Sequence, residues 1–316
     1  MMTELVVGFD TSNYTTSVAV CTREGEMVAN LKRPLPVSEG ACGLRQSDAV
    51  FAHVKNLPSL TEEPRPYLEG GRVVAVGVSA TPRQAQDSYM PCFLSGVAAA
   101  NAFAAACGAP LYSCSHQDGH VRAAVYSSGA EDVLLASPFA AFHVSGGTTE
   151  ILRVAPRADG FSVELVGETE DLNVGQLIDR TGVMMGLSFP CGREMEALAA
   201  QWTGELPQVK TCVRGMRCNL SGLQNLAEKY YRDCNDPRAV SAYVLASVAK
   251  TLQKMTAQLD EACGRMPIVY AGGVMSNRYL QSVLSRRRDT YFAEPAYSAD
   301  NAAGVALLTA DRIRRN

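Results

Sequence analysis

The stretch LVVGFDTSNYTTSVAVCTREGEMVANLKR, residues 5–33, decides how this chain folds. It holds three runs of apolar and β-branched residues, separated first by a polar turn and then by a turn that contains glycine. Runs of this length and composition between such turns are typical of β-strands joined by tight connections. The stretch therefore predicts a three-stranded antiparallel meander.

The same plan returns in the second half of the chain. Residues 138–167 read as the strand FAAFHV, the turn SGGTT, the strand EILRVA, a second turn and the strand FSVELV. Further along, residues 72–82 parallel residues 267–277, and residues 111–120 parallel residues 290–300. Each half therefore predicts a meander followed by alternating helices and strands.

Two copies of such a unit predict a duplicated α/β fold whose two lobes close around a cleft. A single doubly wound sheet without duplication is the alternative that the pattern leaves open. We expect residues 1–115 and 300–316 to form the first lobe, with a helical insertion at about residues 40–66, and residues 116–299 to form the second.

The amino-acid composition limits the class of protein to which this chain can belong. With 316 residues, 47% of them hydrophobic and 19% charged, the chain has enough apolar surface for a large core. The apolar stretch at residues 94–107 is too short to span a bilayer, and the N-terminus lacks the features of a leader peptide. Ten cysteines without a CxxC pair indicate reduced thiols. We expect a cytoplasmic protein with no membrane contact.

The net charge of −3 argues against a broadly basic surface for nucleic acid. The dense arginine clusters, at residues 286–288 and 312–315, are interpreted as solvated helix ends. RNA would then dock through a local patch or through a partner subunit.

Three turns follow strands and are rich in small residues. DTSNYTT (residues 10–16) and HVSGGTTE (residues 143–150) occupy the same place in the two halves, and both offer backbone N–H groups and hydroxyls to phosphate oxygens. In AGGVMSN (residues 271–277), Gly272 and Gly273 would let a nucleotide lie against the backbone. None of these turns is a Walker loop or a GxGxxG fingerprint.

His116 and His120 are four residues apart, so on a helix their imidazoles project from one face and can share a metal ion. The pair alone is ambiguous. Asp300 occupies the corresponding place in the second half of the repeat, so it would face the histidines across the cleft. Two imidazoles and one carboxylate with open positions suit iron or zinc.

A zinc peptidase is the obvious competitor, because HxxxH resembles the HExxH motif. Here the second position is Gln117, so the carboxylate that would act as general base is missing. Asp118 projects in a different direction around the helix. Peptidase activity is therefore disfavoured.

The segment GQLIDRTGVMMGLSFPCGREMEALA, residues 175–199, lies between two of the candidate nucleotide turns. Asp179 sits on its amphipathic part, which ends at a turn that contains proline and glycine. This arrangement could bind a ribose through the carboxylate and let a ligand pass close to Gly192.

Taken in order, these motifs and YSADNAAGVA (residues 297–306) resemble the TsaD family of tRNA threonylcarbamoyladenosine synthases, formerly called O-sialoglycoprotein endopeptidases. The resemblance covers nearly the whole chain. It implies the duplicated fold shared by actin, Hsp70 and sugar kinases, and transfer of a threonylcarbamoyl group from threonylcarbamoyl-AMP to N6 of adenosine 37 in tRNA.

The resemblance also implies ligands and partners. One divalent metal, iron or zinc, would be held by His116, His120 and Asp300, and ATP or an AMP-containing adenylate would be the nucleotide. A related subunit of the same fold, a small ATPase subunit and tRNA would be the partners. The nucleotide contacts would be His143, Val144, Ser145, Gly146, Gly147, Asp179, Gly192 and Asn277.

The chain departs from the usual family motifs near the reacting groups. The departures are Tyr14, Thr15, Thr148, Gln176 and Ile178. Three functions follow as hypotheses: a threonylcarbamoyl transferase or close paralogue, a non-catalytic nucleotide-binding scaffold that pairs with a related subunit, and a metallopeptidase. The residues alone assign no general base.

Overall fold

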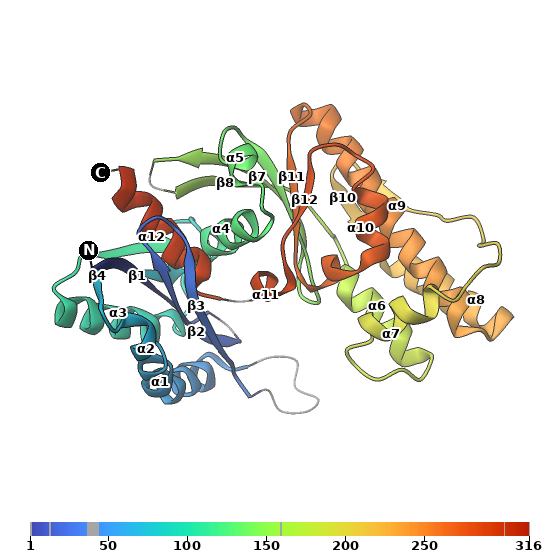
Figure 1. Ribbon diagram of the computed structural model, residues 1–316. Coiled ribbons are helices and arrows are strands. Elements are labelled where there is room, and N and C mark those ends of the chain that lie inside the picture. The colour runs from blue at the N-terminus through green and yellow to red at the C-terminus, as the bar shows by residue number, and fades with distance from the viewer. Residues whose placement is uncertain (1, 13, 37–43, 159, 300, 316) are drawn as a thin grey trace. The chain divides into compact units, whose positions relative to one another are not determined.

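A computed structural model describes residues 2–12, 14–36, 44–158, 160–299 and 301–315 (Figure 1). The chain divides into two compact units. Unit 1 comprises Met1–Gly129, Pro156–Val163 and Ala296–Asn316, and unit 2 comprises Ala130–Ala155 and Glu164–Pro295.

Unit 1 is built on a five-stranded sheet in the order β3-β2-β1-β4-β5. The first three strands form the expected antiparallel meander, and β4 and β5 then add in parallel beside β1. The strands are β1 (Thr3–Asp10), β2 (Thr15–Thr22), β3 (Met27–Pro34), β4 (Gly71–Thr81) and β5 (Leu111–Ser115).

Both faces of this sheet are covered by helices. Leu5, Val7 and Phe9 of β1 point to the face on which α1 and α3 pack, whereas Val6 points to the face covered by α12. At Gly8 a Cβ atom would lie 2.6 Å from the backbone nitrogen of Ala306, so α12 contacts the strand backbone directly. The helices that include unit 1 residues are α1 (Gln46–Glu62), α2 (Arg65–Leu68), α3 (Phe93–Cys107), α4 (His116–Ser127), α11 (Pro295–Ser298) and α12 (Ala303–Arg315).

Unit 2 repeats the sheet in the order β12-β11-β6-β7-β8. Here β6 and β7 are antiparallel, and β11 and β12 add in parallel beside β6. The strands are β6 (Phe139–Val144), β7 (Thr149–Arg157), β8 (Gly160–Glu168), β11 (Ile268–Ala271) and β12 (Thr290–Phe292). The duplication predicted from the sequence is therefore confirmed.

The core of unit 2 forms between this sheet and α9, whose apolar side chains Leu245, Val248 and Leu252 are buried together with Phe142 of β6. A two-stranded ribbon, β9 (Cys212–Arg214) with β10 (Arg217–Asn219), precedes α8. The remaining elements are α5 (Glu131–Leu134), α6 (Val174–Met184), α7 (Gly192–Ala199), α8 (Ser221–Cys234), α9 (Pro237–Cys263), the 3-10 helix η1 (Gly273–Ser276) and α10 (Arg278–Leu284).

The unit boundary differs from the one that we predicted after residue 115. Helix α4 belongs to unit 1, because it packs against α12 and its Arg122 forms an ion pair of 2.7 Å with Asp311. The predicted helical insertion at residues 40–66 contains α1, and residues 40–43 lie outside the described part of the chain. Among the helices that the structure describes, none has the length and apolarity needed to cross a membrane.

Candidate functional site

Helix α4 presents the two predicted metal histidines. The helix begins at His116 because Ser115 caps it: the Ser115 hydroxyl accepts a hydrogen bond from the Asp118 N–H, and the Asp118 side chain accepts one from the Ser115 N–H. His116 and His120 therefore lie one turn apart, with ring centroids 4.3 Å apart. The structure brings this pair together as the spacing predicted.

Asp10 holds the first of these histidines. It ends strand β1, is fully buried, and its Oδ2 lies 2.8 Å from Nδ1 of His116. Burial by itself would raise the pKa of Asp10, but the charge of His116 and hydrogen bonds from His116 and Ser12 outweigh it and lower that pKa. A carboxylate on Nδ1 keeps the proton on that nitrogen, so Nε2 is the atom that would bind a metal.

These residues fit a metal ion by their chemistry. Two imidazoles on one helix face, one of them oriented by a carboxylate, are a common nitrogen ligand set for zinc or iron. Asp300, the predicted third ligand, lies outside the described residues; its neighbours Ser298 and Asn301 belong to unit 1, as α4 does. Among the described residues, no three His, Cys, Asp or Glu side chains gather as a metal site requires.

The acidic residue between the histidines does not serve as a free carboxylate. Asp118 is 3% exposed, and besides capping α4 it accepts a hydrogen bond of 2.6 Å from Nε2 of Gln84. Burial raises the pKa of this carboxyl group. Gln117 carries an amide where a zinc peptidase needs its general base, so the geometry gives that chemistry no base on α4.

The turn between β1 and β2 is not open as the sequence led us to expect. The Thr11 hydroxyl donates to the carbonyl of Cys92 at 2.9 Å and accepts from the N–H of Gly96, so it joins the turn to α3. Thr11 and Ser12 are buried. Thr11 therefore ties the turn to α3, the Ser12 N–H donates to Asp10, and both hydroxyls are turned away from solvent.

The corresponding turn in unit 2 is open. Gly146 and Gly147 are exposed, and no described atom lies within 4 Å of the place where a Cβ would stand on either one. The Ser145 hydroxyl shapes the turn by accepting hydrogen bonds from the N–H groups of Gly147 and Thr148, at 3.3 and 3.1 Å. A phosphate could approach this backbone without meeting a side chain.

Two glycines allow this turn to pack closely against the start of α6 and the end of β11. A Cβ on Gly175, in the first turn of α6, would lie 2.6 Å from the Cα of Gly146, and a Cβ on Gly272 would lie 2.2 Å from the Val144 carbonyl oxygen. Gly272 also has a φ of +101°, which side chains rarely tolerate. The β6–β7 turn, the start of α6 and the end of β11 therefore meet backbone to backbone.

The other predicted nucleotide contacts, among them Asp179 as the predicted ribose residue, lie on elements of unit 2. The Oδ1 of Asp179, on α6, accepts a hydrogen bond of 2.8 Å from the N–H of Cys191, which immediately precedes Gly192. Asn277 caps α10 by accepting from the N–H of Leu280 at 3.0 Å. His143, at the end of β6, lies 3.9 Å from Glu150 across the β6–β7 pair.

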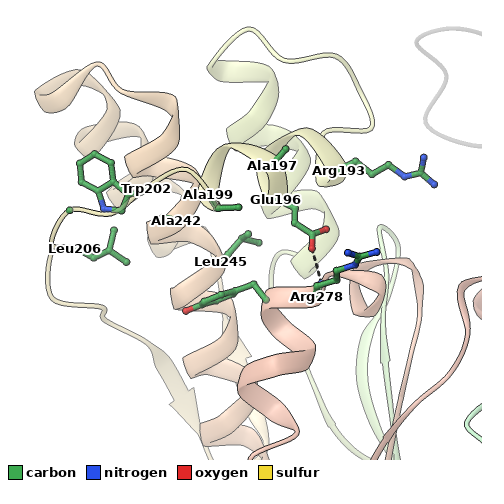
Figure 2. Close-up of a pocket in the computed structure, with 12 residues that line it drawn as sticks. Arg193, Glu196, Ala197, Ala199, Trp202, Leu206, Ala242, Leu245 and Arg278 are labelled. Carbon is green, nitrogen blue, oxygen red and sulfur yellow. Dashed lines mark hydrogen bonds between the residues drawn. The ribbon is translucent and has the colours of Figure 1, made fainter.

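A cavity of about 720 Å³ opens in unit 2 beside Gly192 and Asn277 (Figure 2). Arg193 and Arg278, the residues that follow them, line it together with Glu196, whose Oε1 accepts a hydrogen bond of 2.8 Å from the Arg278 N–H. The remaining lining residues are apolar, aromatic or small: Ala197, Ala199, Ala200, Trp202, Gly204, Leu206, Ala242, Leu245 and Tyr279. Arg193, Glu196 and Arg278 carried no signal that we recognised in the sequence.

Asp10 is the other residue that the sequence analysis missed, as a contributor to the candidate metal site. We interpreted it as part of a phosphate-binding turn, whereas it lies beside His116, 106 residues further along. An acidic residue at the end of a buried strand was the signal available, since such a carboxylate must find a partner.

The sheet order places the chain in the two-lobed class of actin, Hsp70 and sugar kinases. HypF from T. kodakarensis is similar in fold, with 11% identity over 99% of this chain and 48% of that protein and a TM-score of 0.60. Component A of (R)-2-hydroxyglutaryl-CoA dehydratase from Acidaminococcus fermentans is also similar, with 13% identity over 98% and 99% of the two chains and a TM-score of 0.55.

Within that class the chain belongs to the TsaD family, tRNA N6-adenosine threonylcarbamoyltransferase, whose family model matches residues 89–307. A relative named tRNA N6-adenosine threonylcarbamoyltransferase, from Methanopyrus kandleri, is 28% identical over 307 residues. The match covers 96% of this chain and 86% of the relative. The family resemblance inferred from the motifs is confirmed.

Proposed function

We propose that this protein transfers the threonylcarbamoyl group of threonylcarbamoyl-AMP to N6 of adenosine 37 in tRNA. The observation that carries the proposal is the open turn at Ser145–Gly147, which packs against Gly175 at the start of α6, the helix that carries Asp179, and lies next to Gly272 after β11. Family membership supports the same reaction class. ATP or the adenylate is the nucleotide that we assign to this site.

Each part of the adenylate has a suitable partner in unit 2. The open glycines Gly146 and Gly147 suit the phosphate, and the carboxylate of Asp179 suits a ribose hydroxyl. The neighbouring cavity has the volume and the mixed apolar and polar lining of a small-molecule site, and we assign it to the base.

The metal belongs to unit 1 in this proposal. His116 and His120 would hold iron or zinc, with Asp300 as the third ligand, and Asp10 fixes the orientation of His116. A divalent ion there would supply a Lewis acid for a substrate oxygen. The chain's own contribution is to orient the His116 imidazole through its Nδ1 contact with Asp10, so that Nε2 is the ligand atom.

In the transfer itself, the N6 amine of adenine attacks the carbamoyl carbon, and the bond between that carbon and the phosphate oxygen breaks. AMP leaves with the electron pair, and N6 loses one proton to solvent. The turn at Ser145–Gly147 would hold the phosphate as its charge grows, so positioning and charge stabilisation account for the acceleration. No residue is assigned as a general base.

Two of the residues that depart from the family motifs take part in local structure. Gln176 completes a capping box on α6, because its Oε1 accepts from the Asn173 N–H at 3.1 Å. Thr148 closes the β6–β7 turn, since its carbonyl accepts from the Ser145 N–H at 2.8 Å. We therefore propose a working transferase with altered residues near the reacting groups, and we assign it to the cytoplasm.

The test is to incubate the purified protein with threonylcarbamoyl-AMP and unmodified tRNA, together with a related subunit of the same fold and the small ATPase subunit. Mass spectrometry of the digested tRNA would detect the modified adenosine. We expect modification by the wild-type protein and loss of it in Asp179→Asn, which retains the oxygen that accepts from Cys191 but removes the charge. Gln117→Ala, outside the proposed contacts, is the matched control.

The other two hypotheses predict different results in this experiment and in a peptidase assay. A scaffold would bind nucleotide and the related subunit without producing modified tRNA under conditions where a standard synthase does. A metallopeptidase would cleave a glycoprotein substrate and lose that activity with a chelator. Either result would overturn the proposed transfer.

A further inference from the structure

Phe189 is the most exposed large apolar side chain among the residues that the structure describes, at 74% of its full accessible area. It lies in the segment that joins α6 to α7. Exposing a phenylalanine ring to this extent leaves a large apolar surface in water, which is unfavourable unless a partner covers it.

The segment that carries Phe189 is held at both ends. The Leu187 N–H donates to the Gly182 carbonyl at 3.0 Å, and the Cys191 N–H donates to Asp179 at 2.8 Å. Cys191 also packs so closely on Gly182 that a Cβ there would lie 2.3 Å from the Cys191 Cβ. The Phe189 ring therefore projects from a segment whose backbone is held by hydrogen bonds on both sides.

Two arginines flank this segment. Arg180 follows Asp179 on α6 and Arg193 stands in the first turn of α7; both are exposed, and neither forms an ion pair with a described residue. Figure 2 shows the Arg193 side chain extending away from Trp202 and Leu206. The acidic groups nearby are Asp179, which is bonded to the Cys191 N–H, the exposed Glu194, and Glu196, which lines the same cavity as Arg193 and accepts from the Arg278 N–H.

We propose that Phe189 stacks on an unpaired base of the tRNA, while Arg180 and Arg193 bind the adjoining phosphates. This inference rests on the proposed function, since it names how the acceptor is held. An adenine that reacts at N6 must leave the stack of its loop, and an aromatic ring that replaces the lost stacking offsets that cost. Asp179 and Gly192, assigned to the adenylate, border the same segment.

An RNA base fits these features better than a protein surface does. The segment offers one exposed ring, and the Asp179–Cys191 hydrogen bond brings the backbone beside Arg180 close to the start of α7, where Arg193 lies. Val183, 53% exposed, is the only other strongly exposed large apolar residue described between Val174 and Cys191. Protein interfaces usually bury a wider apolar core, whereas single aromatic rings beside arginines are typical of single-stranded nucleic acid contacts.

The test compares Phe189→Ala, Phe189→Leu and Phe189→Trp in the full-length protein assembled with its partner subunits. Fluorescence anisotropy would give the Kd for labelled tRNA, and steady-state kinetics would give KM and kcat. For Ala and Leu we expect Kd and KM for tRNA to rise by roughly tenfold with kcat little changed, and for Trp a value within about twofold of wild type. Calorimetry should give an unchanged affinity for ATP.

Leu is the decisive variant, because it keeps apolar area but has no ring to stack. A Phe189→Leu protein with wild-type tRNA affinity would overturn the stacking contact, and so would an unchanged Kd in Phe189→Ala. Loss of subunit assembly with unaltered tRNA binding would instead identify a protein interface. If wild-type protein binds tRNA in the predicted way but never modifies it, the proposed function fails while the stacking contact stands.

Discussion

The two units contain the same five-stranded sheet, but the turn that joins their first two strands is built differently. In unit 1 the turn after β1 is buried, and Asp10 binds His116. In unit 2 the turn after β6 is exposed, and Gly146 and Gly147 leave the backbone open. The duplicated scaffold therefore provides two equivalent positions, and we propose that the first orients a metal ligand while the second binds a phosphate.

Burial of charge also distinguishes the units. Unit 1 holds an ion pair between Arg122, 2% exposed, and Asp311, whereas the Arg287–Asp260 pair of unit 2 is 15% and 29% exposed. We expect Asp311→Ala to lower the free energy of unfolding by about 3–5 kcal/mol, because the buried guanidinium loses its carboxylate. Asp260→Ala should cost about 1 kcal/mol or less in its more hydrated setting. Chemical denaturation measures both.

The pH dependence of stability tests whether the charge of Asp311 causes this loss. Burial would raise its pKa, but the charges of Arg122 and Arg314 and their hydrogen bonds lower it below the ordinary value of 3.8. Because the pKa of Asp311 is lower in the folded protein than in the unfolded chain, its stabilising effect is complete above pH 3.8. The effect is lost as the pH falls toward the pKa in the folded protein. The stability gap between wild type and Asp311→Ala should therefore narrow below about pH 4. A gap independent of pH would contradict this account.

The backbone contacts of unit 2 give the next largest effect. Gly272→Ala places a Cβ against the Val144 carbonyl at a φ of +101°, so we expect a loss of about 3 kcal/mol from strain and crowding. The adjacent Gly273→Ala is the control, since no described atom lies within 4 Å of its Cβ position. Thermal unfolding without nucleotide compares the two, and equal losses would refute the predicted close approach.

The buried turn of unit 1 is tested at Asp10. In Asp10→Asn the amide would donate to Nδ1 of His116 and move the imidazole proton to Nε2, the atom that we assign to the metal. We expect roughly a 10–100-fold loss of metal affinity, measured by competition with a chelator. Ser12→Ala removes a buried hydroxyl with no described partner and leaves the Ser12 N–H bond to Asp10 in place, so its metal affinity should match wild type.

The smallest effect is expected at Asn277. Asn277→Ala removes the cap of α10 and should lower the free energy of unfolding by about 1 kcal/mol. Asn277→Asp keeps an oxygen at that place, so stability should hold while the added negative charge weakens ATP binding. Unfolding curves and calorimetry separate the two roles, and an Asp variant that binds ATP normally would remove Asn277 from the proposed site.

Much of the fold was predictable because it depends on local patterns. The alternating strands of residues 5–33 and 138–167, and the turns between them, predicted both meanders, and the structure confirms them. The spacing of His116 and His120 likewise predicted one helix face, since helical geometry acts over four residues. The site residues assigned in unit 2 follow from motif resemblance, and their roles stay predictions.

What the sequence by itself determined is therefore the duplicated sheet, the family and the pairing of the histidines. Tertiary structure decided which polar residues are buried and which are left open. Asp10 meets His116, and Arg193 and Arg278 line one cavity, only because strand pairing and helix packing bring distant segments together. A strand's pattern shows that it is buried, but the partner of its last carboxylate is set by the neighbouring elements.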